Sequence, residues 1–129
     1  MKKIIALLSV AFFATAVFAF AAADAKPELR PAQKIMQARV AWLAAINANL
    51  GSKNYEAITN NADELAAQTK KVGDNIPNPL GKELTLAISS FAKEISVAAA
   101  KKDGETIKVK LGDIKGKCGE CHAKIRDKK

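Results

Sequence analysis

Five consecutive residues near the C-terminus, Cys118-Gly-Glu-Cys121-His122, contain every cysteine and histidine of the 129-residue chain. The two cysteines are three positions apart, so on a helix both thiols emerge from one face, and the imidazole follows directly. This order suits covalent haem attachment, in which two thiols add to the porphyrin vinyl groups and the adjacent imidazole binds the iron. We therefore expect one haem c, with Cys118 and Cys121 as its thioether attachments and His122 as the proximal iron ligand.

Three other chemistries use similar cysteine pairs. A structural zinc site normally has four Cys or His ligands, whereas this chain has three such residues in total. A thioredoxin-type pair begins a helix within a βαβ unit, but this pair lies near the end of a predicted helix in an all-helical pattern. A disulfide would suit an exported chain but would leave the adjacent histidine unexplained. The pentapeptide therefore favours haem over these alternatives.

Apolar side chains recur at helical spacing in four segments that would position this site. Each segment has one apolar face, as expected for helices of about 20 residues that pack together. Since the connections are short, the sequence predicts an all-α, up-down-up-down four-helix bundle with the haem attached to its last helix. The four faces comprise Met36, Val40, Leu43, Ile46 and Leu50; Tyr55, Ile58, Ala62, Leu65, Thr69 and Val72; Leu84, Ile88, Phe91, Ile95 and Ala98; and Ile107, Leu111, Ile114, Cys118, Cys121 and Ile125.

Cap and turn residues predict where these helices begin and end. Gly51 is expected to end the first helix, and Ser52 or Asn54 to cap the second. The stretch GDNIPNP, residues 73–79, is predicted to be a loop. Asp103-Gly104 is expected to separate the third helix from the fourth.

Three glycines lie within the fourth predicted helix, where each would cost about 1 kcal/mol relative to alanine. Gly112, Gly116 and Gly119 are spaced four and three residues apart. One interpretation is that they let the backbone approach the porphyrin or another helix closely. The alternative is a helix break around residues 112–116.

The first 25 residues have the features of a secretory signal peptide. Two lysines precede an apolar run at residues 4–23 that ends in small side chains. A permanent membrane anchor is the alternative, because the run is almost long enough to span a bilayer, but the alanine-rich end favours cleavage after about residue 23–25. We expect a signal peptide at 1–25, a four-helix-bundle domain at 26–129, a periplasmic location and no stable membrane anchor.

The domain that would follow the signal peptide is basic. Removal of residues 1–25 takes away two of the 21 Lys and Arg and one of the 13 Asp and Glu, leaving a net charge of +7. A basic surface suits an acidic protein partner. Nucleic acid is not expected, because the lysines are dispersed and only Trp42, Tyr55 and Phe91 could stack on bases.

A four-helix bundle with CxxCH near the end of its last helix resembles the class II c-type cytochromes, which comprise cytochrome c-prime and its low-spin relatives. That family commonly continues CHxx(Tyr/Phe)Arg, and this chain continues C-H-A-K-I-R, so Arg126 matches and Ile125 departs. Phe91 stands where the family often has a bulky aromatic side chain. Arg126, one turn beyond His122, is a candidate for contact with a haem propionate or the proximal pocket, with simple solvent exposure as the alternative.

The second axial position of the iron decides the function. With one histidine in the chain, this position is open or is bound by methionine or lysine. Met36 is the only methionine after Met1, and the low-spin relatives take a methionine from a first-helix stretch similar to RPAQKIMQARVAWL. The resemblance therefore implies Met36 as the distal ligand, whereas an inward methionine used only for core packing is the alternative.

Met/His ligation would imply a soluble periplasmic one-electron carrier with a raised reduction potential, not an enzyme. An open position would imply a five-coordinate haem protein that binds nitric oxide or carbon monoxide, as cytochrome c-prime does. The family also implies a possible homodimer through the first two helices. Four basic side chains near the expected haem edge could guide an acidic redox partner: Lys115, Lys117, Lys124 and Arg126.

Overall fold

The structure, a computed structural model, describes residues 28–128 and is all-helical, as the sequence predicts. The predicted signal peptide at 1–25 lies outside these residues. No helix within the described range is long and apolar enough to cross a membrane. In that range the chain forms four α-helices and one π-helical turn: α1 (Pro31–Gly51), α2 (Tyr55–Asp74), α3 (Pro79–Ala100), α4 (Gly104–Cys121) and η1 (His122–Arg126).

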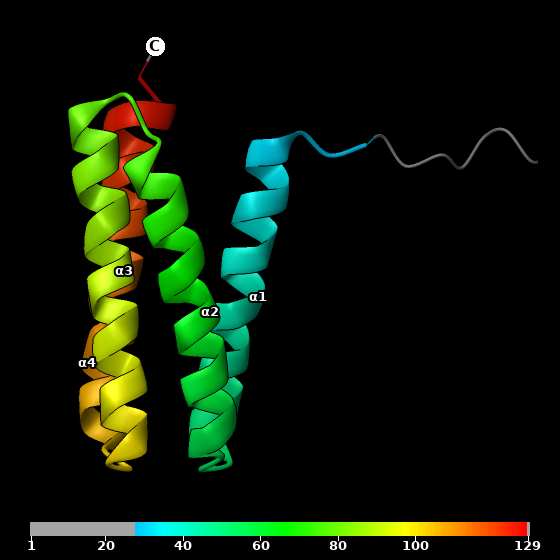
Figure 1. Ribbon diagram of the computed structural model, residues 1–129, viewed down its shortest axis with the longest axis vertical. Helices are drawn as coiled ribbons and strands as arrows, with labels where there is room; N and C mark the ends of the chain where they lie inside the picture. The colour runs from blue at the N-terminus through cyan, green and yellow to red at the C-terminus, as the bar shows by residue number, and fades with distance from the viewer. Residues whose placement is uncertain (1–27, 129) are drawn as a thin grey trace, which may run out of the picture. The chain divides into compact units, whose positions relative to one another are not determined.

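Helices that follow one another in the chain pack side by side. α2 packs against α1 and α3, and α3 packs against α4, whereas α1 and α4 have no comparable contact in the described chain. Figure 1 shows the α1–α2 and α3–α4 connections at one end of these helices and the α2–α3 connection at the other. The start of α1 and the end of α4 therefore lie toward the same end, where the CxxCH segment is located.

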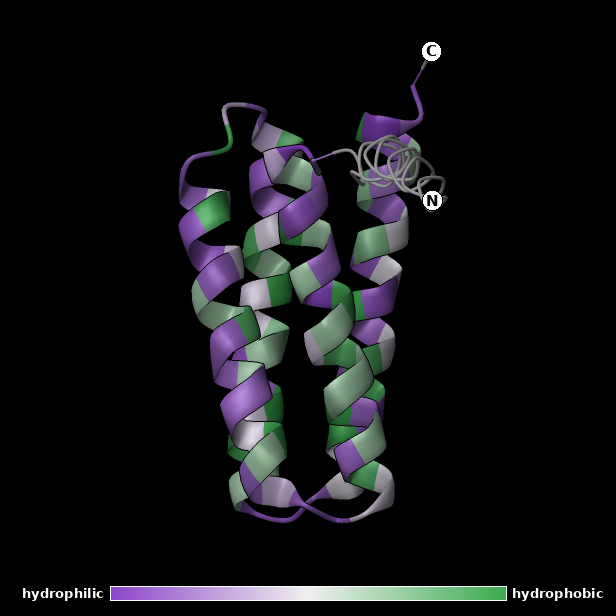
Figure 2. Ribbon diagram, turned by 90° about the vertical axis from the view of Figure 1, so that its right-hand side faces the viewer, coloured by the Kyte–Doolittle hydropathy of each residue, from purple (hydrophilic) through white to green (hydrophobic). Residues whose placement is uncertain are grey.

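The hydrophobic core is formed mainly by α2 and α3. Figure 2 shows hydrophobic and hydrophilic residues alternating along each helix, the pattern of amphipathic helices. α1 buries only Arg39 and Ile46 among its residues, and α4 only Ile107 and Ile114. The core cluster comprises Ile46, Ile58, Ala62, Leu65, Ala66, Ile88, Ala92, Ile95, Ala98, Ala99, Ile107 and Ile114.

The predicted apolar face of α1 is buried only in part. Met36 is 41% exposed and Val40 is 66% exposed, although the pattern placed both on the packing face. Leu43 and Leu50 are half-buried against the core. Because α4 does not pack along this face, Met36 and Val40 stay exposed although α2 packs beside α1.

Several boundaries differ from the prediction by a few residues. α2 continues through Gly73 and Asp74, which were predicted to lie in the loop. A Cβ added at Gly73 would come within 2.7 Å of the Leu86 side chain, so the glycine leaves room for the close approach of α2 and α3 at this point. Gly51 is still helical, and the chain reverses at Lys53, which has a positive φ of 57°.

The helix starts are set by side-chain caps. Asn54 accepts a hydrogen bond from the Ala57 N–H and is therefore the cap of α2, one of the two residues predicted for this role. Asn78 accepts from the Gly81 N–H at the start of α3. Asp103 accepts from the backbone and the hydroxyl of Thr106 at the start of α4.

α4 is continuous through its three glycines, so the predicted alternative of a helix break is wrong. A Cβ added at Gly112, Gly116 or Gly119 would meet no heavy atom of another segment within 4 Å. These glycines therefore do not serve a close approach between α4 and another helix. An approach of the porphyrin to this backbone stays a prediction.

Candidate functional site

A cavity of about 430 Å³ lies between α1 and α4, where the two helices stand apart. Its volume is within the range of about 300–1,000 Å³ that is usual for small-molecule and cofactor sites. The two helices line it mostly with apolar side chains. The lining residues are Met36, Arg39, Val40, Leu43 and Asn47 from α1, Leu111, Lys115 and Cys118 from α4, and His122 from η1.

The two walls of this cavity have matching periodicity. On α1, Met36, Val40, Leu43 and Asn47 are separated by four, three and four residues; on α4 and η1, Leu111, Lys115, Cys118 and His122 have the same separations. Both runs are the single-face spacing of a helix. Since the start of α1 and the end of α4 lie toward the same end, Met36 and His122 are the lining residues nearest that end.

The two cysteines lie in the last turn of α4, and both are free thiols. Cys118 lines the cavity and also packs against the hydrophobic core. Burial raises the pKa of its thiol, and the nearby positive charge of Arg39 partly opposes this rise. Cys121 is half-buried, one turn further along the helix, and is not among the lining residues.

The backbone changes from α-helical to π-helical immediately after Cys121. The Asp127 N–H donates to the His122 carbonyl oxygen at 2.9 Å, five residues apart, as in a π-helical turn. Such turns occur frequently at functional sites because they locally change the direction of side chains. His122 is the first residue of the turn and is half-buried against the cavity.

Ile125, which departs from the CHxx(Tyr/Phe)Arg pattern, packs toward the α2–α3 connection. A Cβ added at Gly81 would lie 3.3 Å from the Ile125 Cδ1 atom and 3.2 Å from the Ile76 Cγ2 atom. The absence of a side chain at Gly81 therefore makes room for Ile125. This contact ties the segment that carries His122 to the start of α3.

Arg39 is the one charged side chain that is buried in the described part of the chain, with 6% of its surface exposed. Its Nε donates to the Gln68 Oε1 atom on α2 at 2.9 Å. Its Nη2 atom is buried and has no hydrogen-bond partner. Burial lowers the pKa of the guanidinium, and Cys118 and Cys121 lie near enough for their ionised thiols to oppose this shift.

Arg39 was not among the site residues predicted from the sequence. A signal was available, because Arg39 follows Met36 by three positions and therefore lies on the apolar face of α1. A charged residue on such a face is either a solvated edge residue or a buried group with a specific role. Sequence alone does not separate these cases, because the answer depends on which residue of α2 lies opposite.

Three of the four basic residues predicted around the site pair with a carboxylate close to them in the chain. Arg126 is exposed and bonds Asp127 through Nε at 2.6 Å and Nη2 at 3.1 Å, and it does not line the cavity. Lys117 and Lys124 both pair with Glu120, at 3.2 and 2.7 Å. Of the four basic residues predicted near the haem edge, Lys115 is the one that lines the cavity.

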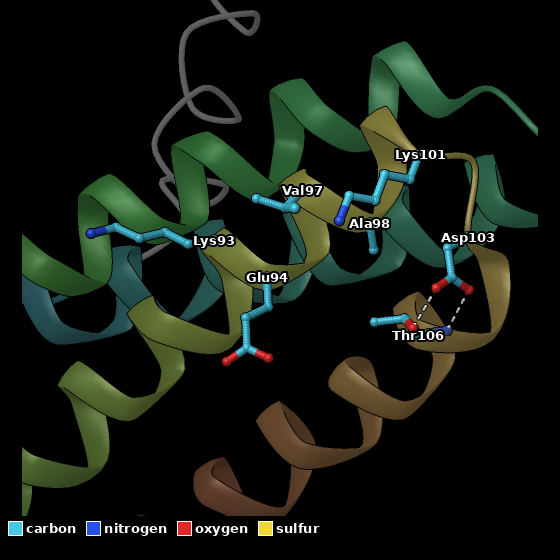
Figure 3. A pocket seen from close by; sticks show the side chains of 7 residues that line it. All are labelled: Lys93, Glu94, Val97, Ala98, Lys101, Asp103 and Thr106. Atoms are coloured by element: carbon cyan, nitrogen blue, oxygen red, sulfur yellow. Dashed lines mark hydrogen bonds between the residues drawn. The ribbon is translucent and has the colours of Figure 1, made fainter.

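A second hollow of about 360 Å³ lies beside α3 and the start of α4 and is lined by polar and small side chains (Figure 3). Its acidic groups already have partners. Asp103 accepts two hydrogen bonds from Thr106, and Glu94 pairs with Lys110 at 2.7 Å. The hollow has no cysteine, histidine or methionine in its lining, so the chemistry expected from the sequence belongs to the α1–α4 cavity.

The structure thus brings Met36, Cys118 and His122 together on one cavity, with Cys121 beside it and Arg126 outside it. No group of three or more His, Cys, Asp or Glu side chains among residues 28–128 is arranged to hold a metal ion. Comparisons with known protein families, with curated proteins and with solved structures found no match to this chain.

Proposed function

We propose that this protein is a soluble periplasmic one-electron carrier whose single haem c is bound covalently in the α1–α4 cavity of an up-down-up-down four-helix bundle. The observation that supports the proposal best is that Met36, Cys118 and His122 line the same largely apolar cavity. The sequence pattern selected these residues from segments about 80 residues apart. Signal cleavage after about residue 23–25 belongs to this proposal.

The side chains in and directly beside the cavity fit a haem c group in number and type. Cys118 and Cys121 supply two thiols from one helical face for the thioether bonds, and His122 supplies the proximal nitrogen. Met36 supplies a thioether from the opposite wall as the distal ligand. The largely apolar lining would suit the faces of a porphyrin, and a bound haem would supply reversible one-electron chemistry.

The chain's own residues would keep this chemistry to electron transfer. With His122 and Met36 on the two axial positions, no position is open for a substrate. The described chain also has no second histidine to act as an acid or base beside the iron. We therefore propose a carrier and not an enzyme.

The partners are also part of the proposal. A basic domain suits an acidic redox protein, and Lys115 at the cavity is placed to contribute to that contact. The pairs of Lys117 and Lys124 with Glu120 reduce the positive charge that those residues offer. A homodimer through α1 and α2, implied by the family resemblance, is included as a proposed assembly.

One observation favours a second function. Met36 is 41% exposed, so the packing of the chain does not hold its side chain in place. A ligand held this weakly could leave the distal position open to nitric oxide or carbon monoxide. The five-coordinate, gas-binding alternative therefore stays the second candidate.

The decisive experiment is to purify the exported protein and denature it. We expect the polypeptide to keep its colour on a denaturing gel and to have the mass of the cleaved chain plus one haem. The Cys118→Ala/Cys121→Ala double variant should be colourless under the same conditions. A colourless wild-type chain with the mass of the bare polypeptide would overturn the proposal.

A further inference from the structure

We propose that Arg39 is a buried cation that raises the reduction potential of the haem, and that Gln68 is its positioning residue. This inference rests on the proposed function, because it concerns the potential of the bound haem. Gln68 holds the guanidinium in place without cancelling its charge.

The first support is the way in which Arg39 is buried. It lines the α1–α4 cavity from the same face as Met36, and 94% of its surface is removed from solvent. In the described part of the chain, Arg39 has no salt bridge to a carboxylate, and its Nη2 atom has no hydrogen-bond partner. A buried charge usually has an opposite charge beside it, so a neutral partner requires an explanation.

The second support is the choice of that partner. The Gln68 side-chain oxygen accepts from the Arg39 Nε at 2.9 Å across the α1–α2 interface. A glutamate has the same length and could accept the same bond, but it would neutralise the cation. The amide therefore holds the guanidinium through a hydrogen bond and leaves its positive charge uncancelled beside the cavity.

The physical effect follows from the charge of the iron. Ferric haem carries one more positive charge than ferrous haem, so a nearby cation favours the ferrous form and raises the potential. Arg39 lines the same cavity as Cys118 and His122, the residues that would attach the haem and bind its iron. In a poorly solvated site this electrostatic effect is much stronger than at the surface.

The surface cations have a weaker effect for two reasons. Lys117, Lys124 and Arg126 each pair with a carboxylate within four residues along the chain, whereas Lys115, which also lines the cavity, is exposed to solvent. Exposed charges are also screened by salt over about 8 Å at physiological ionic strength. We therefore assign the electrostatic setting of the potential to Arg39 and not to the net charge of the domain.

The test introduces a carboxylate beside Arg39 and measures the midpoint potential by spectroelectrochemistry. Gln68→Glu should lower the equilibrium constant for reduction about tenfold, which corresponds to about 59 mV for one electron. The matched control is Asn60→Asp, which makes the same amide-to-carboxylate change at an exposed position of α2 and should shift this constant less than about twofold. The haem content and the visible spectrum of both variants should equal those of the wild type.

Two results would overturn the inference. One is a haem-loaded Gln68→Glu protein whose potential shifts no more than that of Asn60→Asp. The other is measured on the wild type, so it does not require a folded variant. If raising the salt from about 0.1 to 1 M lowers the equilibrium constant for reduction about tenfold, the effect on the potential comes from surface charges that salt screens. A wild-type chain without covalent haem would instead overturn the proposed function, so the two failures are distinguishable.

Discussion

Met36 is the residue on which the distal side of the proposed site depends. It is on the cavity wall opposite α4 and lies toward the end of the cavity where His122 is found. Its exposed fraction of 41% is unusual for a residue used only to fill a core. The placement supports a role as a ligand more than the alternative of core packing, which the sequence left open.

Replacement of Met36 by alanine should therefore change the iron and not the fold. We expect Met36→Ala to convert a low-spin spectrum with a methionine-to-ferric charge-transfer band into a high-spin spectrum, and to allow rapid binding of carbon monoxide. The free energy of unfolding of the haem-free chain should fall by less than it would for a fully buried methionine, because 41% of the residue is exposed.

The control for this experiment is Val40→Ala, which shortens a neighbouring side chain of the same cavity wall. It should leave the low-spin spectrum intact. If Met36→Ala has no effect on the spectrum, Met36 is not a ligand. If the wild type is already high-spin and binds carbon monoxide rapidly, the gas-binding function becomes the favoured one.

At the scale of single elements, α4 contains three glycines at positions where a Cβ atom would meet no neighbouring atom within 4 Å. Gly116 is exposed, is in the interior of the helix, and has open space where a Cβ would stand. Gly116→Ala should raise the free energy of unfolding of the haem-free chain by about 0.5–1 kcal/mol, measured by denaturant titration.

The haem-loaded protein distinguishes the two roles of this glycine. If the porphyrin approaches the α4 backbone at Gly116, the alanine variant should lose haem content despite its better helix propensity. Unchanged haem content would argue against that approach. Gly81→Ala is the contrast, because Ile76 and Ile125 crowd the Cβ position there, so its gain in stability should be smaller.

The start of α4 should be sensitive to acid because of its cap. The hydroxyl and N–H of Thr106 donate to the Asp103 carboxylate and lower its pKa below the ordinary value of 3.8. A depressed pKa stabilises the fold above the unfolded-state pKa, and this stabilisation is lost as the pH falls through the folded-state value.

The measurement compares wild type with Asp103→Asn over a range of pH. Their difference in free energy of unfolding should be constant well above pH 3.8 and should decrease toward zero below it. Asn54→Ala, which removes the neutral cap of α2, should have an effect that does not vary with pH over the same range. A pH-independent difference for Asp103→Asn would contradict the expected role of its charge.

At the scale of the whole molecule, α1 has few buried contacts, because the cavity separates it from α4. Among its residues α1 buries only Arg39 and Ile46, whereas α3 buries nine residues. A helix with few buried contacts opens more readily than its neighbours. A haem in the cavity would supply the missing contacts between α1 and α4.

Hydrogen exchange can test this difference in local stability. In the Cys118→Ala/Cys121→Ala chain, amide protons in the first half of α1 should exchange faster than those in α3. In the haem-loaded wild type, the protection of α1 should increase more than that of α3. Equal protection of α1 and α3 in the haem-free chain would show that α1 does not depend on a cofactor for its order.

The helices and their order could be predicted from the sequence because they depend on local features. Apolar periodicity, the Asn54 cap and the prolines near residues 77–79 act within a few residues along the chain. The boundary at Gly73 and Asp74 was missed because glycine usually ends a helix, whereas here Gly73 is buried in α2 close to Leu86 of α3. Local sequence does not contain that contact.

The sequence by itself determined the chemistry available to this protein: two thiols, one imidazole and one further methionine, at spacings that favour covalent haem. Only the tertiary structure decided which of these side chains share a cavity, and it added Arg39 with its neutral partner Gln68. It also showed that Arg126 lies outside the cavity and donates a hydrogen bond to Asp127. The reason is that helical periodicity determines which face a residue occupies, whereas the packing of α1 against α2, and its separation from α4, determines what that face meets.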